Sequence, residues 1–335
     1  MTAADLLGAA MLAALVLYAL LGGADFGGGI WDLLASGPRR EAQRDLISHA
    51  LGPVWEANHV WLILVIVVLF TAFPSAFAVV SIELFVPLVL LLFGIVLRGA
   101  AFTFRTYDRE DDRVQARWGL LFSMSSVLAP LVLGVAVGAL ASGRLRVAAQ
   151  GTEPFAWLRP FPLAVGLFAA SLFAYLAATY LAVEAEGPLR DDFRRRAIAA
   201  GVAVFACAAL AAGLSWREAP VVFFGLTRRA WSLPLHAGTA AAAIAAFVAL
   251  FRGRVRTARA AAAAQVILIV LGWGASQYPW IVVPDVTLAG ASAPRATQVA
   301  LLWALAGGSV LLFPALYALF RVFKGERPFA VVDHR

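Results

Sequence analysis

The sequence predicts an all-α polytopic membrane protein, and its composition, its apolar runs and its loop charges each support this class. Of the 335 residues, 62% are hydrophobic and only 14% are charged, whereas soluble domains carry about 25% charged residues. Apolar runs long enough to cross a bilayer recur along the whole chain. The net charge of +7 is not gathered into long basic runs on a polar domain, so it does not indicate a nucleic-acid partner.

Nine apolar segments are predicted to span the membrane as helices. They cover about residues 5–35, 52–73, 77–105, 118–141, 161–183, 197–214, 231–251, 260–278 and 297–320. Within the first, Gly23 and Gly27 are small residues four apart, which favours close contact with a neighbouring helix. The glycines of residues 22–29 continue an apolar helix, whereas a phosphate-binding loop would follow a strand.

The arginine distribution predicts the orientation. If the N-terminus lies outside, the segments on the inside hold 19 of the 27 lysines and arginines, those on the outside hold seven, and Arg98 remains within a span. Because cytoplasmic loops carry the excess of Lys and Arg, we expect the N-terminus outside and the C-terminus in the cytoplasm. That arrangement requires an odd number of spans.

A short internal repeat suggests how the spans are grouped. Gly37-Pro38-Arg39-Arg40 returns 150 residues later as Gly187-Pro188-Leu189-Arg190, and both segments are predicted inside loops. We therefore expect two four-helix bundles, followed by one peripheral helix. These three parts comprise residues 1–142, 143–278 and 279–335, the last including the cytoplasmic tail.

Polar groups on three predicted spans lie at similar depth. Glu56 and His59 are three residues apart and share a helix face at the start of the second span. The predicted orientation also places Asp25 of the first span and Arg98 of the third in the inner half of the membrane. An acid at the bilayer centre costs about 2.5–3.5 kcal/mol on insertion scales, so such groups suggest a function and a partner on another helix.

Three interpretations of these groups stay open. The first is a proton path through Glu56, Asp25 and His59, and the second is a structural ion pair in which Arg98 locks the first three helices. The third is that the groups bind a substrate. Taken by itself, His59 is expected to be a histidine that packs between helices rather than a haem ligand. Four scattered histidines and the single Cys207 predict no metal site and exclude an internal disulfide.

Several motifs in order along the chain resemble subunit II of the cytochrome bd quinol oxidases. They are Gly23-Ala24-Asp25-Phe26-Gly27-Gly28-Gly29, the run G-P-V-W-E-A-N-H-V-W-L at 52–62, Phe73-Pro74, Arg98-Gly99 with Phe102 and Arg105, Ala178-Thr179-Tyr180-Leu181 with Glu184 and Arg190, and Gln277-Tyr278-Pro279 with Pro284. The resemblance covers almost the whole chain, and residues 217–229 are hardest to align. The Trp-Glu-x-Asn-x-Val-Trp run is its most specific part.

The resemblance implies a complex in the bacterial cytoplasmic (inner) membrane that oxidises quinol and reduces dioxygen to water. A partner of similar fold, subunit I, would carry haems b and d, and no haem is expected in this chain. Some members of the family hold a quinone in subunit II, and small single-span accessory subunits and lipids are further expected partners. The acid of the Trp-acid-x-Asn motif, here Glu56, is implicated in proton delivery, and Asp25 matches the acid of the Gly-rich motif. Trp55, Asn58 and Trp61 are expected to pack helices together, as are Gly23 and Gly27.

Two alternatives share the apolar spans. A solute or ion transporter commonly has inverted repeats and a site at the midplane, whereas the repeat here is parallel and the polar groups lie on one side. A purely structural membrane subunit would differ only in that Glu56 and Asp25 would not titrate during turnover.

Overall fold

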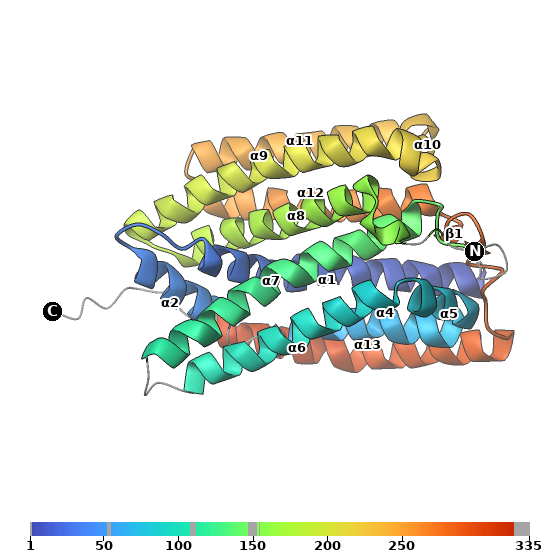
Figure 1. Cartoon of the computed structure of the whole chain (residues 1–335), viewed down its shortest axis with the longest axis horizontal. Helices are drawn as coiled ribbons and strands as arrows, with labels where there is room; N and C mark the ends of the chain where they lie inside the picture. Colours follow the sequence, from blue (N-terminus) through green and yellow to red (C-terminus); the bar gives the residue numbers. More distant parts are fainter. Residues whose placement is uncertain (1, 52–54, 108–111, 147–152, 154, 325–335) are drawn as a thin grey trace.

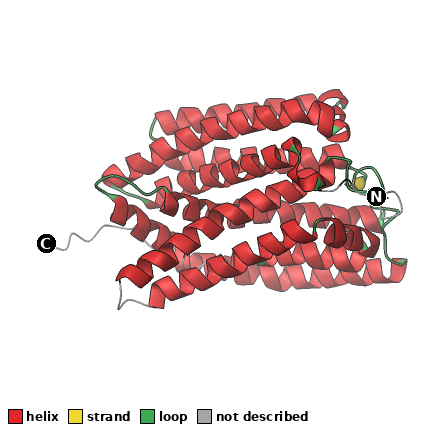
Figure 2. Cartoon of the chain, in the orientation of Figure 1, coloured by secondary structure: helices red, strands yellow, loops and turns green. Residues whose placement is uncertain are grey.

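The computed structural model describes residues 2–51, 55–107, 112–146, 153 and 155–324, and nearly all of them are helical. Figures 1 and 2 show long helices lying roughly side by side along one direction. The long helices are α1 (Ala3–Leu33), α6 (Phe85–Tyr107), α7 (Asp112–Ala141), α8 (Pro160–Glu184), α9 (Gly187–Glu218), α11 (Ser232–Phe251), α12 (Val255–Gln277) and α13 (Arg295–Lys324). Shorter elements are α2 (Arg40–Leu51), α3 (Trp55–Asn58), α4 (Val60–Ala72), α5 (Pro74–Glu83), a 3₁₀ turn (Ala156–Leu158) and α10 (Pro220–Arg228).

In the described part of the chain, eight helices are long and apolar enough to cross a membrane. The predicted class, an all-α polytopic membrane protein, is therefore confirmed. A further candidate is the pair α4 and α5, which passes the same test together but is bent by 118° at the break between them.

The boundaries predicted for the second and third spans, 52–73 and 77–105, differ from the helices in the structure. Pro74 is the first residue of α5, where its missing N–H costs nothing. Pro87 lies in the first turn of α6. It has no N–H to donate to the carbonyl oxygen of Glu83, four residues earlier, and its ring would clash with that carbonyl in a continuous helix. The helix therefore ends at Glu83 and restarts at Phe85, so that α5 is separate from α6.

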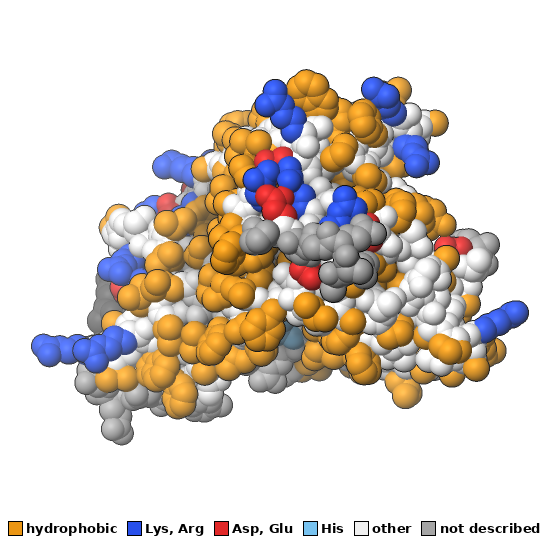
Figure 3. All heavy atoms as spheres, turned by 45° about the vertical axis from the view of Figure 1, so that its right-hand side comes forward, with side chains coloured by type: hydrophobic (Ala, Val, Ile, Leu, Met, Phe, Trp, Pro, Cys, Tyr) orange, Lys and Arg blue, Asp and Glu red, His pale blue; other side chains and the backbone are white. Residues whose placement is uncertain are grey.

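Two elements at the same end of the molecule were not predicted. Helix α10 occupies most of 217–229, the stretch that is hardest to align and that lies between the spans predicted at 197–214 and 231–251. An antiparallel pair, β1 (Trp280–Val282) and β2 (Val286–Thr287), follows α12. Between the strands, Asp285 accepts a hydrogen bond from Arg146 at 2.9 Å. Figure 3 turns this end of the molecule toward the viewer, and charged side chains gather there within a largely hydrophobic surface.

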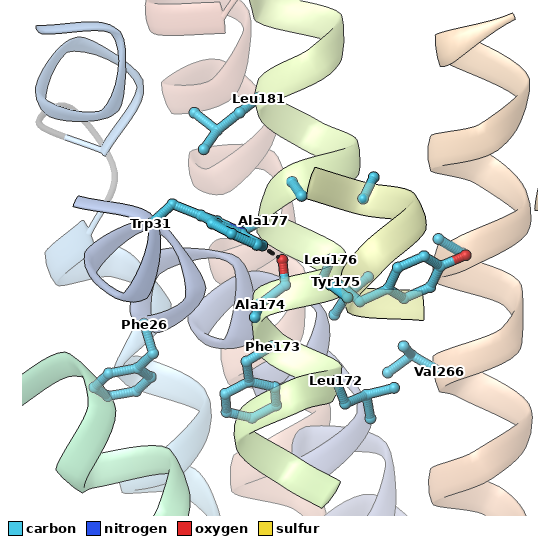
Figure 4. Packing of buried hydrophobic residues seen from close by; sticks show 14 of the residues in the cluster. Phe26, Trp31, Leu172, Phe173, Ala174, Tyr175, Leu176, Ala177, Leu181 and Val266 are labelled. Carbon is cyan, nitrogen blue, oxygen red and sulfur yellow. Dashed lines mark hydrogen bonds between the residues drawn. The ribbon is translucent and has the colours of Figure 1, made fainter. Parts of the chain in front are cut away.

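The core is built where α1 packs on α8. A Cβ at Gly27 would overlap the carbonyl oxygen of Phe173, and one at Gly23 would lie 2.7 Å from the Phe173 ring. The absence of a side chain at both glycines thus lets the two helices touch. Close by, Trp31 donates its indole N–H to the carbonyl oxygen of Ala174 at 2.7 Å, as Figure 4 shows.

The two halves of the predicted repeat meet at the end of the molecule where α2 lies (Figure 1). Arg39, in the loop before α2, makes a salt bridge of 2.6 Å to Asp192 in the first turns of α9. Gln43 of α2 also donates to Asp192, at 3.2 Å, and accepts from Arg196 at 2.7 Å. These contacts join α2 to the first turns of α9. We call this end of the molecule the α2 end.

Candidate functional site

A buried acid lies in α1 toward the α2 end. Asp25 is only 3% exposed, and its carboxylate accepts a hydrogen bond from the side-chain amide of Asn58 in α3. Gly28, one turn further along α1, leaves room for the side chain of Leu51, because a Cβ there would lie 2.9 Å from it. The glycines therefore allow the chain around α3 to approach α1 closely enough for Asn58 to reach Asp25. Asn58 was expected to pack helices together, and its amide joins α3 to α1 through this hydrogen bond.

Arg98 of α6 is buried against the same turn of α1, with 2% exposure. Its guanidinium donates to the backbone carbonyl oxygen of Asp25 at 3.1 Å and to the hydroxyl of Ser126 in α7 at 3.1 Å. The guanidinium carbon lies 5.0 Å from the ring centroid of Phe26 and 5.2 Å from that of Phe122. Cation–π contacts and hydrogen bonds thus offset the cost of burying the charge, and Arg98 connects α1, α6 and α7.

His59 lies at the N-terminus of α4, immediately after Asn58. Its ring centroid is 6.0 Å from that of Tyr18 and 5.8 Å from that of Phe26, both of α1. His59 therefore packs against the face of α1 that also carries Asp25. The structure brings Asp25, Asn58, His59 and Arg98 together around one stretch of α1.

The remaining predicted residues are placed as follows. Glu56 and Trp55 belong to α3, but their side chains lie outside the described residues, so the Glu56–Arg98 pair is not described. Trp61 of α4 is buried and packs against the ring of Phe313 in α13, with 6.2 Å between centroids.

A cavity of about 300 Å³ reaches Asp25 and Asn58 from the α2 end. Its wall includes Tyr180 and Glu184, in the last two turns of α8, and Arg259 near the start of α12. The guanidinium of Arg259 lies 5.9 Å from the Tyr180 ring centroid. Because α8 ends and α12 begins at this end of the molecule, the charged side chains lie at the mouth and Asp25 lies deeper. The arrangement can lead water or a proton from one end of the molecule to a buried carboxylate.

Sequence reasoning missed the residues at this mouth. The resemblance named Tyr180 and Glu184 without giving them a role, and Arg259 was only one of the charges that set the orientation. A signal was present, since Tyr180 and Glu184 are four residues apart and therefore share a helix face.

A second buried acid was also missed. Asp32 is 1% exposed and accepts from Arg105 of α6 at 3.0 Å and from the Ser123 hydroxyl of α7 at 2.7 Å. It follows Asp25 by seven residues, or about two helical turns, so both acids face the same side of α1. That spacing could have identified it.

The metal-ligating residues of the described part do not converge. No group of three or more His, Cys, Asp or Glu there could hold a metal ion. The described histidines, His49, His59 and His236, lie in α2, at the start of α4 and in α11. Nδ1 of His236 is 2.7 Å from the carbonyl oxygen of Ser232 in its own helix. Haem iron takes its axial ligands from such side chains, and no two of the described histidines share a helix.

Comparison with protein families finds one match along nearly the whole chain. The family described as cytochrome bd terminal oxidase subunit II matches residues 4–323. The chain is 30% identical over 204 residues to the cytochrome bd-I ubiquinol oxidase subunit 2 of Escherichia coli (strain K12), which covers 59% of this chain and 53% of that protein. The match thus spans about half the length of that relative. Similarity to the putative cytochrome bd menaquinol oxidase subunit II of Bacillus subtilis (strain 168) is lower, 24% over 323 residues, but covers 93% of this chain and 92% of that one.

The fold has a counterpart among solved structures. A chain in the structure of bd oxidase from Geobacillus thermodenitrificans superposes with a TM-score of 0.82, covering 98% of this chain and 100% of that chain. The sequences are 21% identical over this match, so the likeness is one of fold.

Proposed function

Because the chain belongs to the cytochrome bd terminal oxidase subunit II family, we propose that it acts within a quinol oxidase of the bacterial cytoplasmic membrane. In that reaction two quinols give up four electrons and four protons, and one dioxygen takes up four of each to form two waters. The observation that carries the proposal is the family match along residues 4–323. The proposal names the substrate class, a quinol, because the relatives are named as ubiquinol and menaquinol oxidases.

The proposal assigns haems b and d to a partner, subunit I, and not to this chain. This assignment is supported by the positions of the described histidines of this chain, which lie in different helices. The haems would supply the electron transfer and the binding of dioxygen, while this chain would support assembly with the partner and bring protons to it from the cytoplasm. Small single-span subunits and a bound quinone are further components that the family implies.

Purification tests the assignment. The chain carrying an affinity tag, extracted from membranes of its own cells, is expected to bring with it a haem-rich subunit of similar size and quinol-driven oxygen uptake. Recovery of the chain alone, or with a partner that lacks haem, would contradict the proposal and favour a transporter.

The proton role rests on the cavity. Protons would enter at the mouth near Glu184 and Arg259, reach the Asp25–Asn58 pair, and pass Glu56 and His59 toward the partner. The route is supported by the depth at which Asp25 is buried and by the cavity that connects it to the α2 end. Asp25 and Glu56 would carry the protons, and Asn58 and Arg98 would hold Asp25 in place.

The finer topology is also a proposal. Counting the bent pair α4 and α5 as one span gives nine, in two four-helix bundles (residues 1–142 and 143–278) and a third part (279–335) with one peripheral helix. The N-terminus would lie outside and the α2 end in the cytoplasm, in line with the arginine excess in the loops at that end.

Single cysteines test this orientation. In a Cys207→Ser background, Gln150→Cys is expected to react with an impermeant thiol reagent added to intact cells, and Gln115→Cys only after the membrane is opened. The reason is that residues 108–117 are predicted to lie inside and 142–160 outside. Labelling of Gln115→Cys in intact cells would reverse the orientation.

A further inference from the structure

An open basic groove lies at the α2 end, away from the Asp25 cavity. It has a volume of about 470 Å³ and lies between the first turns of α9 and the turn that joins α11 to α12. Arg190 and Arg194 line it from α9, and Phe251 and Arg252 line it from the end of α11. Neither the proposed oxidase activity nor the proton route uses these residues.

The groove has an excess of positive charge. Its one acid, Asp191, pairs with Arg194 at 3.1 Å, and Arg194 also donates to the backbone carbonyl of Leu250 at 3.1 Å. Arg190 uses its Nε on the carbonyl of Ala185 at 2.9 Å. The guanidinium of Arg252 makes no hydrogen bond within the described part of the chain. Three guanidinium groups therefore face one carboxylate, and N–H donors remain for an anion.

An apolar surface continues from this groove along the helices. Phe251, at its edge, is 65% exposed, and its ring lies 6.4 Å from that of Phe247. The Phe247 ring rests on Gly201 of α9, where a Cβ would lie 2.7 Å away. Further along α9, Phe205 is 76% exposed. Figure 1 shows α9 and α11 together at one edge of the molecule, where few other helices cover them.

We propose that this groove binds the headgroup of an anionic phospholipid, with its acyl chains along the exposed side chains of α9 and α11. Basic pockets where helices leave the membrane recognise such headgroups, because the arginines meet the phosphate while the tails remain in hydrocarbon. A free phosphate ion would meet the same arginines but would gain nothing from Phe251 and Phe205. The amphipathic shape of the surface therefore favours the lipid.

Lipid titration of the purified complex, followed by native mass spectrometry, tests this proposal. Phosphatidylglycerol is the probe, and phosphatidylcholine is its zwitterionic control. Arg252→Gln is expected to weaken phosphatidylglycerol binding roughly fivefold, and the double variant Arg190→Gln/Arg252→Gln roughly 25-fold, from the affinity that each arginine near a membrane surface contributes. Arg256→Gln removes the same charge from an exposed position outside the groove, so binding should stay as in the wild type.

A further variant separates lipid from phosphate. Phe251→Ala keeps every arginine. It is expected to weaken phosphatidylglycerol binding, whereas the concentration of inorganic phosphate that displaces the lipid should stay as in the wild type. An equal loss of phosphatidylglycerol affinity in Arg252→Gln and Arg256→Gln would overturn the proposal, because it would indicate that the lipid binds through general surface charge and not in the groove. Unchanged lipid binding in Phe251→Ala, with displacement by millimolar phosphate, would overturn it in favour of a free anion. Phosphatidylcholine that binds as tightly as phosphatidylglycerol would also overturn it.

Discussion

Replacing Glu56 by glutamine is expected to leave the complex assembled, with its haems, and to slow quinol-driven oxygen uptake by roughly a hundredfold, the lower end of what a proton-transferring side chain contributes. Glutamine keeps the shape and hydrogen bonding of glutamate but cannot carry a proton. Glu56 lies two residues before Asn58, whose amide holds Asp25 at the inner end of the cavity. The measurement is the rate of oxygen consumption with excess quinol, normalised to haem.

Two further variants are the controls for this result. Glu56→Asp keeps the acid on a shorter arm and should retain partial activity, whereas Asp25→Asn should lose activity as Glu56→Gln does. Full oxygen uptake in an intact Glu56→Gln complex would refute the proton route. A Glu56→Gln complex that fails to assemble would instead favour the structural ion pair with Arg98.

Gly27→Ala is expected to destabilise the assembled complex by about 3 kcal/mol or more, at the upper end of the cost of adding a methyl group to a packed interior. The new Cβ would overlap the backbone carbonyl of Phe173. A backbone atom cannot rotate away as a side chain can, so α1 and α8 would have to separate. That separation would also disturb the Trp31–Ala174 hydrogen bond and the neighbouring Asp25. Yield and thermal unfolding of the complex in detergent measure the effect.

Gly213→Ala is the matched control for this change. Gly213 is also inside a long helix, α9, but a Cβ there meets nothing within 4 Å. Alanine favours a helix more than glycine does, so this variant should be at least as stable as the wild type. A Gly27→Ala complex as stable as Gly213→Ala would contradict the close packing of α1 on α8.

The sequence predicted best what depends on long apolar runs. Seven predicted spans correspond to single long helices, since hydropathy over about twenty residues leaves few alternatives. The break before Pro74 coincides with the gap between the spans predicted at 52–73 and 77–105. The break between α5 and α6 was missed because residues 77–105 are mostly apolar, and only Glu83 and Pro87 interrupt the run near it. Helix α10 and the β1–β2 pair lie outside the spans, where short-range turn chemistry and tertiary contacts decide the structure.

The candidate site was predictable only in part. Asp25, Glu56 and Arg98 stood out because charged residues are rare inside spans. Glu184 and Arg259 did not, because each lies near a helix end, where charge is ordinary. Their approach to one another depends on how α8 packs against α12, which no local pattern shows. The tertiary arrangement, and not composition, places them at the mouth of the cavity.

The cavity has an electrical consequence. Asp25 is eight residues before Leu33, the last residue of α1, or about 12 Å at the helical rise, in a hydrocarbon layer of about 30 Å. Water in the cavity would hold Asp25 near the voltage of the solution at the α2 end, so the transmembrane voltage would drop across the remaining thickness. A proton moving from that solution to Asp25 would then do little electrical work. The cost of about 2.3 kcal/mol per charge and 100 mV would fall on the transfers beyond Asp25, and those steps would carry the voltage dependence of turnover.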